Sequence, residues 1–241
     1  MINQINLSLI GWLNGISASL IVLSAGIFGL IMAFQSKNKN SKILFFGGLM
    51  GFFAGMHWLG PAADFLSVIL TGQNLPDEKI CGVLTFVWVL PLLIVTMFVG
   101  GDLMLSNKKN KYILVIISAI IGIVFELFLF LDLDAAIKHS PDPNGFELYD
   151  PKIVIGHPTF YLIGIGLLLL FGFVVIGGYR QGLKTTGALR SRFFYMATAI
   201  FLFIPIAVID AFYEPILIVL AMRFLMIFVA SLMYLSLKIK V

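Results

Sequence analysis

The chain has 241 residues, of which 60% are hydrophobic and 12% are charged, and its mean hydropathy is +1.05. Soluble domains carry about 25% charged residues, so this composition excludes an ordinary soluble domain and indicates an integral membrane protein. The net charge of +4 does not indicate a nucleic-acid partner, because most basic residues lie in short segments beside apolar runs, where they set orientation.

Seven apolar runs are long enough to cross a lipid bilayer, which takes about 20 residues of helix. Because backbone N–H and C=O groups find no water in lipid, each run is predicted to be a helix. We therefore expect an all-α integral membrane protein, a bundle of seven transmembrane helices that forms one domain. The predicted spans are residues 8–35, 43–71, 80–105, 112–132, 159–181, 193–212 and 214–237.

The basic residues gather on one side of the predicted spans. Twelve of the 16 lie at the ends of the first, third, fifth and seventh runs or in the segments that follow them, and three lie in the other connections. The positive-inside rule then predicts a multi-pass protein of the cell membrane with its N-terminus outside and its C-terminus in the cytoplasm. The longest outer loop, 133–158, joins the fourth and fifth spans, and we expect it to cover the outer mouth of the bundle.

Arg223 is the one basic residue inside a long apolar run. It lies about nine residues, or roughly 13 Å, from the start of the last span. A cation at that depth is costly, so we expect its guanidinium to lie inside the bundle near a carboxylate. Glu126 has a similar depth in the fourth span, whereas Asp210 precedes a tight turn at Tyr213 that makes the last two spans neighbours. The pairing is interpreted either as part of a ligand pocket or as a structural ion pair.

His57 and Asp64 are seven residues apart in the second predicted span, so they share a helix face. Their separation, about 10 Å along the axis, is too large for both to bind one metal ion directly. A proton relay, a stripe of a pocket and simple hydrogen bonds to a neighbouring helix all fit this spacing. With the acids and the arginine they complete the candidate ligand-binding set: Arg223, Glu126, Asp210, Asp64 and His57.

Other features bear on packing and cofactors. Gly47, Gly51 and Gly55 share one face of the second span, which favours a close helix contact within the bundle or in a homodimer. Pro91 and Pro205 lie in mid-span and are expected to kink their helices. No metal motif, phosphate-binding loop or membrane-embedded lysine for a retinal Schiff base occurs, so no cofactor is predicted.

Seven helices, an external N-terminus and basic cytoplasmic loops resemble the topology of G-protein-coupled receptors. Pro205 in the sixth span and Cys81 at the outer start of the third add to this resemblance. The receptor motifs are missing: the third span ends in Gly100-Gly101-Asp102, the last contains Ser231-Leu232-Met233-Tyr234, and Cys81 is the only cysteine, so the receptor disulfide has no second partner.

The chain also resembles the seven-helix sensor modules that precede prokaryotic histidine kinases. The similarity lies in Gly187-Ala188-Leu189-Arg190-Ser191-Arg192, followed by an apolar helix that ends near Asp210. This resemblance implies a sensor whose transmitter is a separate cytoplasmic partner.

These observations predict a receptor-like or sensor-like protein that binds a small or amphipathic ligand in an outward-facing pocket within the bilayer. A small transporter or proton-coupled carrier would use the same ionisable residues and is the alternative. An intramembrane enzyme is a third, weaker interpretation. Apolar packing below Arg223 would favour the sensor, and polar groups along the whole path would favour the carrier.

Overall fold

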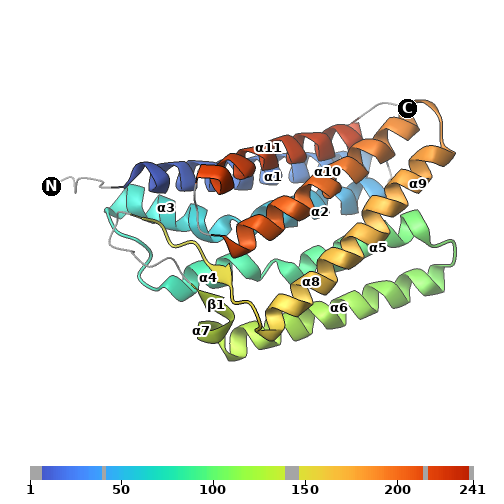
Figure 1. Cartoon of the computed structure of the whole chain (residues 1–241). Helices are drawn as coiled ribbons and strands as arrows, with labels where there is room; N and C mark the ends of the chain where they lie inside the picture. Colours follow the sequence, from blue (N-terminus) through green and yellow to red (C-terminus); the bar gives the residue numbers. More distant parts are fainter. Residues whose placement is uncertain (1–6, 40–41, 139–146, 214–216, 239–241) are drawn as a thin grey trace.

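The computed structural model describes residues 7–39, 42–138, 147–213 and 217–238, and these residues are almost entirely helical. Figure 1 shows long helices that run side by side along one axis of an elongated bundle. The helices are α1 (Leu9–Lys39), α2 (Lys42–Met56), α3 (Leu59–Thr71), α4 (Glu78–Phe86), α5 (Val89–Met104), α6 (Lys108–Leu131), α7 (Leu133–Ala136), α8 (Pro158–Leu170), the π-helix η1 (Phe171–Ile176), α9 (Gly177–Lys184), α10 (Gly187–Phe212) and α11 (Leu217–Lys238). Two short strands, β1 (Ile137–Lys138) and β2 (Lys152–Ile153), pair antiparallel.

An apolar helix or helix pair stands at each of the seven predicted runs. Within the described residues, six helical stretches are long and apolar enough to cross a membrane, and the bent pair α2 and α3 makes a seventh when counted as one span. The structure is thus that of an all-helical chain with the dimensions of a multi-pass membrane protein. The predicted turn at 214–215 and the middle of the predicted loop, 139–146, lie outside the described residues.

The helices form a ring around an apolar core. In sequence around the ring, α1 packs on α2, α2 on α5, α5 on α6, and α6 on α8, while η1 contacts α10, α10 contacts α11, and α11 returns to α1. The core inside this ring is built from large aliphatic and Met side chains such as Met50, Val99, Val174, Ile200 and Met226. Burying these side chains away from polar solvent and packing them at high density holds the ring together.

Prolines explain the interruptions in two of the predicted spans. Pro61 has no N–H for the carbonyl of His57, four residues earlier, and its ring crowds that carbonyl. The helix accordingly stops at His57–Trp58, and α2 and α3 meet at an angle of 54°. Pro91 stands in the same relation to Val87, where α4 gives way to α5. Pro205, by contrast, lies within the continuous helix α10.

The break at Pro61 differs from the single helix predicted over 43–71, which was wrong in this respect. A proline in the first turn of a helix is tolerated because the first N–H groups have no partner within the helix. Pro61 lies inside the predicted span 43–71, and its effect on this helix was not predicted from the sequence.

Glycine in the second predicted span allows a close contact between α1 and α2. A Cβ at Gly55 would collide with the side chain of Ala25 in α1, and a Cβ at Gly29 of α1 would lie 2.7 Å from Cβ of Phe52. The backbones of α1 and α2 therefore approach closely because glycine stands on both sides of the contact.

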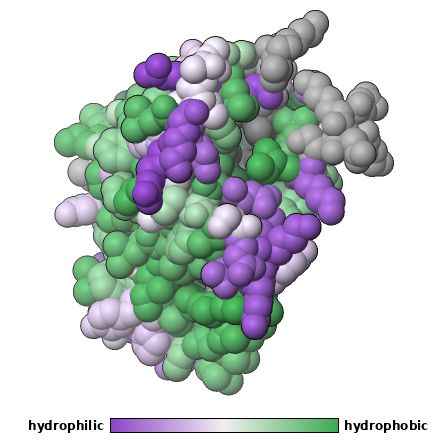
Figure 2. Space-filling view, turned by 90° about the vertical axis from the view of Figure 1, so that its right-hand side faces the viewer, coloured by the Kyte–Doolittle hydropathy of each residue, from purple (hydrophilic) through white to green (hydrophobic). Residues whose placement is uncertain are grey.

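The two ends of the bundle differ in charge and in structure. One end, here the basic end, exposes Lys108, Lys109, Lys184 and Arg190. Figure 2 looks onto this end and shows hydrophilic residues gathered there, with apolar residues on the flanks. At the opposite end β1 and β2 pair. The segment 147–153, which we call the strap, crosses the ends of the helices there. We call this end the strap end.

Candidate functional site: a buried ion network beside an apolar cavity

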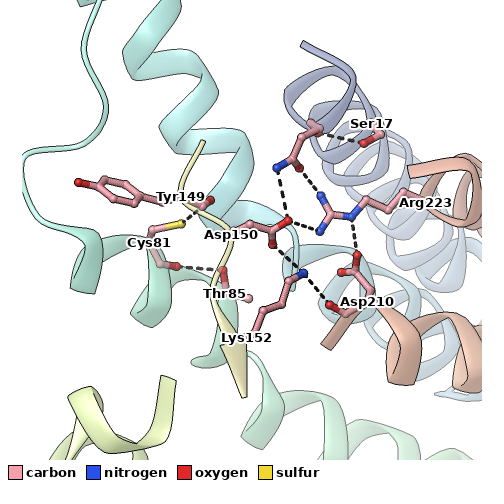
Figure 3. A network of polar contacts seen from close by, with 9 residues as sticks. Ser17, Cys81, Thr85, Tyr149, Asp150, Lys152, Asp210 and Arg223 are labelled. Atoms are coloured by element: carbon pink, nitrogen blue, oxygen red, sulfur yellow. Dashed lines mark hydrogen bonds and ion pairs between the residues drawn. The ribbon is translucent and has the colours of Figure 1, made fainter. Parts of the chain in front are cut away.

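Arg223 is fully buried, with 0% of its side chain exposed. It comes from α11, and its guanidinium points toward the strap and toward the end of α10 (Figure 3). Each nitrogen has an acceptor: Nε donates to Asp210 Oδ1 over 2.5 Å, Nη2 donates to Asp150 Oδ2 over 2.8 Å, and Nη1 donates to Asn14 Oδ1. The prediction that Arg223 lies inside the bundle next to a carboxylate is confirmed, with Asp210 as one partner.

The strap supplies the rest of the network. Lys152 Nζ lies 3.1 Å from Asp150 Oδ1 and donates to the backbone carbonyl of Asp210 over 2.7 Å. Asn14 Nδ2 also donates to Asp150 Oδ2, at 3.3 Å. Two cations, Arg223 and Lys152, thus face two carboxylates, Asp150 and Asp210, and the network carries no net charge. A buried group of this kind is tolerable because every charge has a close partner of opposite sign.

The ionisation of Asp150 follows from these neighbours. Burial alone would raise the pKa of its carboxyl group, since the charged form loses water. The positive charges of Arg223 and Lys152, with the hydrogen bonds that both donate, outweigh burial and hold the pKa below its usual value. Asp150 is therefore a carboxylate at neutral pH, as the ion pairs require.

Asp64 fixes the strap to α3. Its carboxylate accepts hydrogen bonds from the backbone N–H of Leu75 at 2.7 Å, from the backbone N–H of Tyr149 at 2.8 Å and from Asn74 Nδ2 at 2.8 Å. Asn74 donates in addition to the carbonyl of Glu147 at 2.9 Å. Asp64 is completely buried, so these donors replace the water that its carboxylate loses.

A cavity of about 110 Å³ lies directly beside the ion network. Its walls are mainly apolar side chains from the α2–α3 break, α4, α5, α8 and α10. Asp150 and Asp210 of the network line it, together with His57, Trp58 and Thr85. A mainly apolar chamber with a few convergent polar groups is the usual form of a small-molecule site.

Three of these polar groups differ in how they are bonded. Thr85 Oγ1 donates to the carbonyl of Cys81 at 2.9 Å, and His57 Nδ1 lies 3.0 Å from the carbonyl of Phe53. The indole N–H of Trp58 is buried and has no hydrogen-bond partner among the described residues. An unpaired donor in an apolar interior is costly, and this nitrogen is too enclosed to open on the cavity.

The five residues singled out from the sequence occupy four different environments. His57 and Asp210 line the cavity. Arg223 does not line the cavity but is hydrogen-bonded to Asp210, which does. Asp64 is hydrogen-bonded to the strap. Glu126 lies half-buried on α6, a helix that packs on α5 and α8, and it is not among the partners of Arg223. Equal depth had favoured Glu126, but depth in a span does not determine which helices are neighbours.

Three network residues were missed: Asn14, Asp150 and Lys152. Asp150 and Lys152 lie in the predicted loop 133–158, and nothing in the local sequence separates them from the other charges of this segment. Asn14 offered a signal, because an amide inside an apolar run of the first span needs partners.

Among the described residues, no group of three His, Cys, Asp or Glu side chains is arranged to hold a metal ion. A comparison with protein-family models, a search of curated proteins and a search of solved structures each gave no match. The function proposed below therefore rests on the geometry of the network and the cavity.

Proposed function

We propose that this protein is a seven-helix membrane receptor or sensor, with its N-terminus outside the cell membrane and its C-terminus in the cytoplasm. It binds a small or amphipathic ligand in the cavity beside the ion network and signals through a separate cytoplasmic partner. The basic end then faces the cytoplasm, as the distribution of Lys and Arg favours.

The observation that carries this proposal is that Asp150 and Asp210 belong both to the wall of the cavity and to the ion network. Both line the cavity, and both bind Arg223. A ligand in the cavity thus contacts side chains that link α10, α11 and the strap. Asn14 of α1 joins the same network through its hydrogen bond with Arg223. Any ligand that changes these contacts changes how α10 and α11 are held, and both helices continue to the basic end.

The packing between the cavity and the basic end favours a sensor over a carrier. Val95, Val99 and Leu103 on α5 face Val174, Ile200 and Met226 in one apolar core. Thr96 contributes a buried hydroxyl in this region, and the hydroxyls of Tyr179 and Thr198, 3.0 Å apart, lie at the edge of the same core. A sensor needs such a closed core to transmit helix movement, whereas a carrier needs a route that opens to the second side.

The alternative, a carrier, has one specific observation in its favour. The breaks between α2 and α3 and between α4 and α5 both lie at the cavity, where His57, Trp58, Phe86 and Val89 contribute to its wall. Interrupted helices next to a central site are a common feature of transporters. A proton-coupled carrier would show ligand-dependent proton movement across a sealed membrane.

Hydrogen–deuterium exchange of the protein in lipid nanodiscs tests the proposal, with hexan-1-ol as a small amphipathic probe. We expect the probe to change exchange in the segment 182–192 at the basic end. The variant Gly166→Leu, which fills the cavity from α8, should abolish this change, whereas Gly164→Leu on the same helix, where the added side chain meets open space, should not.

The same probe distinguishes the two functions in sealed proteoliposomes with an internal pH dye. A sensor gives no proton flux on addition of hexan-1-ol. A flux that Gly166→Leu removes would favour the carrier. Unchanged exchange at 182–192 in a protein that does bind the probe would overturn the sensor.

A further inference from the structure

The cavity beside the ion network is open on one side. Most of its wall is buried, including Phe86, Val89 and Leu92. Apart from His57, the lining residues that keep some exposure all belong to α8 or α10. These two helices make little direct contact: α8 packs on α5, α6 and η1, whereas α10 packs on η1, α9 and α11. Within the described part of the chain, the cavity therefore opens between α8 and α10.

Two contacts frame this opening. Toward the strap end, the rings of Phe160 on α8 and Phe212 on α10 meet edge to face, with their centroids 5.2 Å apart. Toward the basic end, η1 continues α8 and packs against α10. The outer faces of these helices are apolar, with Ile165, Leu168 and Phe201 exposed. In a membrane, an apolar flank of this kind faces lipid, so the opening leads into the bilayer.

The depth of the opening places it among acyl chains. The apolar stretch Pro158–Lys184 has 27 residues, which corresponds to roughly 40 Å of helix. The lining residues Ile163 and Leu170 lie five and twelve residues after Pro158, or roughly 8 and 18 Å along the axis. A hydrocarbon core of about 30 Å centred on this stretch begins about 5 Å from Pro158. Both residues therefore lie within the hydrocarbon, on the strap side of its midplane.

The chemistry of the wall favours hydrocarbon as the occupant. The lining side chains are mainly apolar. Asp150 and Asp210 are already paired with Arg223, and Lys152 balances the second carboxylate. A charged group would bring an unpaired charge into this chamber, which is unfavourable. Water is a poor occupant as well, because a buried water makes about three hydrogen bonds to polar partners.

A glycine makes room for this occupant. Gly166 is buried in the part of the wall that α8 contributes. A Cβ at this position would lie 3.0 Å from Cδ2 of Leu93, a lining residue on α5. A larger side chain at Gly166 would therefore occupy the chamber. Gly164 of the same helix has no neighbour within 4 Å of an added Cβ, so a side chain there extends away from the chamber.

We propose that the cavity binds one hydrocarbon chain of a membrane lipid, which enters from the bilayer between α8 and α10 while its headgroup stays at the membrane surface. This inference rests on the proposed ligand-binding function and names the class of ligand. A chamber of about 110 Å³ holds a segment of one chain, since a dry apolar cavity of about 150 Å³ accepts benzene. The segment then lies beside Asp150 and Asp210, which connect the cavity with Arg223.

Photocrosslinking in nanodiscs tests this directly. The probe is a phosphatidylcholine with a diazirine in the middle of one acyl chain, and mass spectrometry of peptides identifies the labelled residues. Any surrounding lipid should label the exposed Leu168 and Phe201. We expect the probe to label Leu93 and Phe203 as well, here called the buried pair, which only a chain inside the cavity reaches. The same lipid with its diazirine on the headgroup should leave the buried pair unlabelled.

Variants separate occupancy of the cavity from contact with the bilayer. Gly166→Leu should lower labelling of the buried pair about tenfold, the effect of losing the burial of two methylene groups, and should leave labelling of Leu168 unchanged. Gly164→Leu should preserve both. Ala207→Leu narrows the opening from α10 and should also lower labelling of the buried pair. Unchanged labelling of Leu168 reports that each variant is folded.

The possible results bear on different parts of the inference. Labelling confined to Leu168 and Phe201 in the wild type would overturn it, as would labelling of the buried pair that persists in both blocked variants. Labelling of the buried pair by diazirine-bearing hexadecane but not by the phospholipid would overturn the membrane lipid as the source of the chain.

The exchange experiment distinguishes this inference from the proposed function. An exchange change at 182–192 with hexan-1-ol, in a protein whose buried pair the lipid probe does not label, would defeat only the lipid chain as ligand. Labelling of the buried pair with no exchange change at 182–192 would leave this inference standing and defeat only the signalling role.

Discussion

Arg223 Nε and Asp210 Oδ1 are 2.5 Å apart, and they join α11 to α10 inside the bundle. The two residues lie on consecutive helices that pack on each other. Asp150 reaches the same guanidinium from the strap at 2.8 Å. One arginine thus holds two helices and a long connection in a fixed relation, and the cavity lies beside this junction.

The first prediction concerns the charge balance of the network. Arg223→Met leaves the buried carboxylate of Asp150 with only Lys152 as a charged partner and that of Asp210, which is partly buried, with none, and we expect a loss of about 3–5 kcal/mol in the free energy of unfolding. Arg223→Met with Asp150→Asn removes one charge of each sign and should recover part of that loss, by about 0.5–3 kcal/mol. Denaturant unfolding in nonionic detergent measures both.

An exposed ion pair provides the control for this comparison. Lys79 and Asp134 are 2.9 Å apart but are largely exposed, so Lys79→Met should change stability little. If the double variant is no more stable than Arg223→Met, and the variant with Asp210→Asn behaves likewise, the network does not contribute through charge pairing.

The second prediction concerns pH. The folded-state pKa of Asp150 lies below its unfolded value, so the stabilisation from its ionised form is fully present above about pH 4. It is lost as the pH falls through the lowered folded-state pKa. We expect the unfolding midpoint to fall below about pH 4 in the wild type and to fall less steeply in Asp150→Asn. Parallel pH profiles for the two proteins would contradict this assignment.

The third prediction concerns the anchor of the strap. Asp64→Ala removes the acceptor for Leu75, Asn74 and Tyr149, and hydrogen bonds to a charged acceptor are worth about 1.5–3 kcal/mol each. Backbone exchange at Tyr149 and Leu75 should accelerate. The control, Asp77→Ala, removes an exposed carboxylate that accepts from the N–H of Lys79, and it should leave exchange in the strap unchanged.

The fourth prediction concerns the close contact between α1 and α2. Gly55→Ala places a methyl group against Ala25, and we expect destabilisation of about 1–3 kcal/mol from overpacking. Gly164→Ala on α8 meets open space and should stay within about 1 kcal/mol of the wild type, on the stabilising side. A neutral Gly55→Ala would mean that α1 and α2 can separate without cost.

The fifth prediction concerns orientation. In a chain whose only cysteine, Cys81, is replaced by alanine, a cysteine introduced at Asn110 should be labelled only after the membrane is opened. A cysteine introduced at Asp134 should be labelled from outside, since its side chain is largely exposed at the strap end. Labelling of position 110 in intact cells would reverse the proposed topology.

The positions of the spans followed from the sequence because hydropathy is a local, one-dimensional property. Each of the seven predicted runs holds a helix or a helix pair, and the need of Arg223 for a carboxylate followed from the cost of burying a charge in apolar surroundings. The proximity of Asp210 to Arg223 could also be predicted from the sequence, because a short connection places consecutive helices side by side.

The remaining features depended on tertiary structure. Asp150 and Arg223 are 73 residues apart, and no local pattern distinguishes Asp150 from the other acids of its loop. The cavity is enclosed by five helical segments and the strap, so no single stretch of sequence contains it. Glu126 shares the depth of Arg223 but lies on a helix elsewhere in the ring, since hydropathy sets how deep a residue lies and only helix packing sets what it faces.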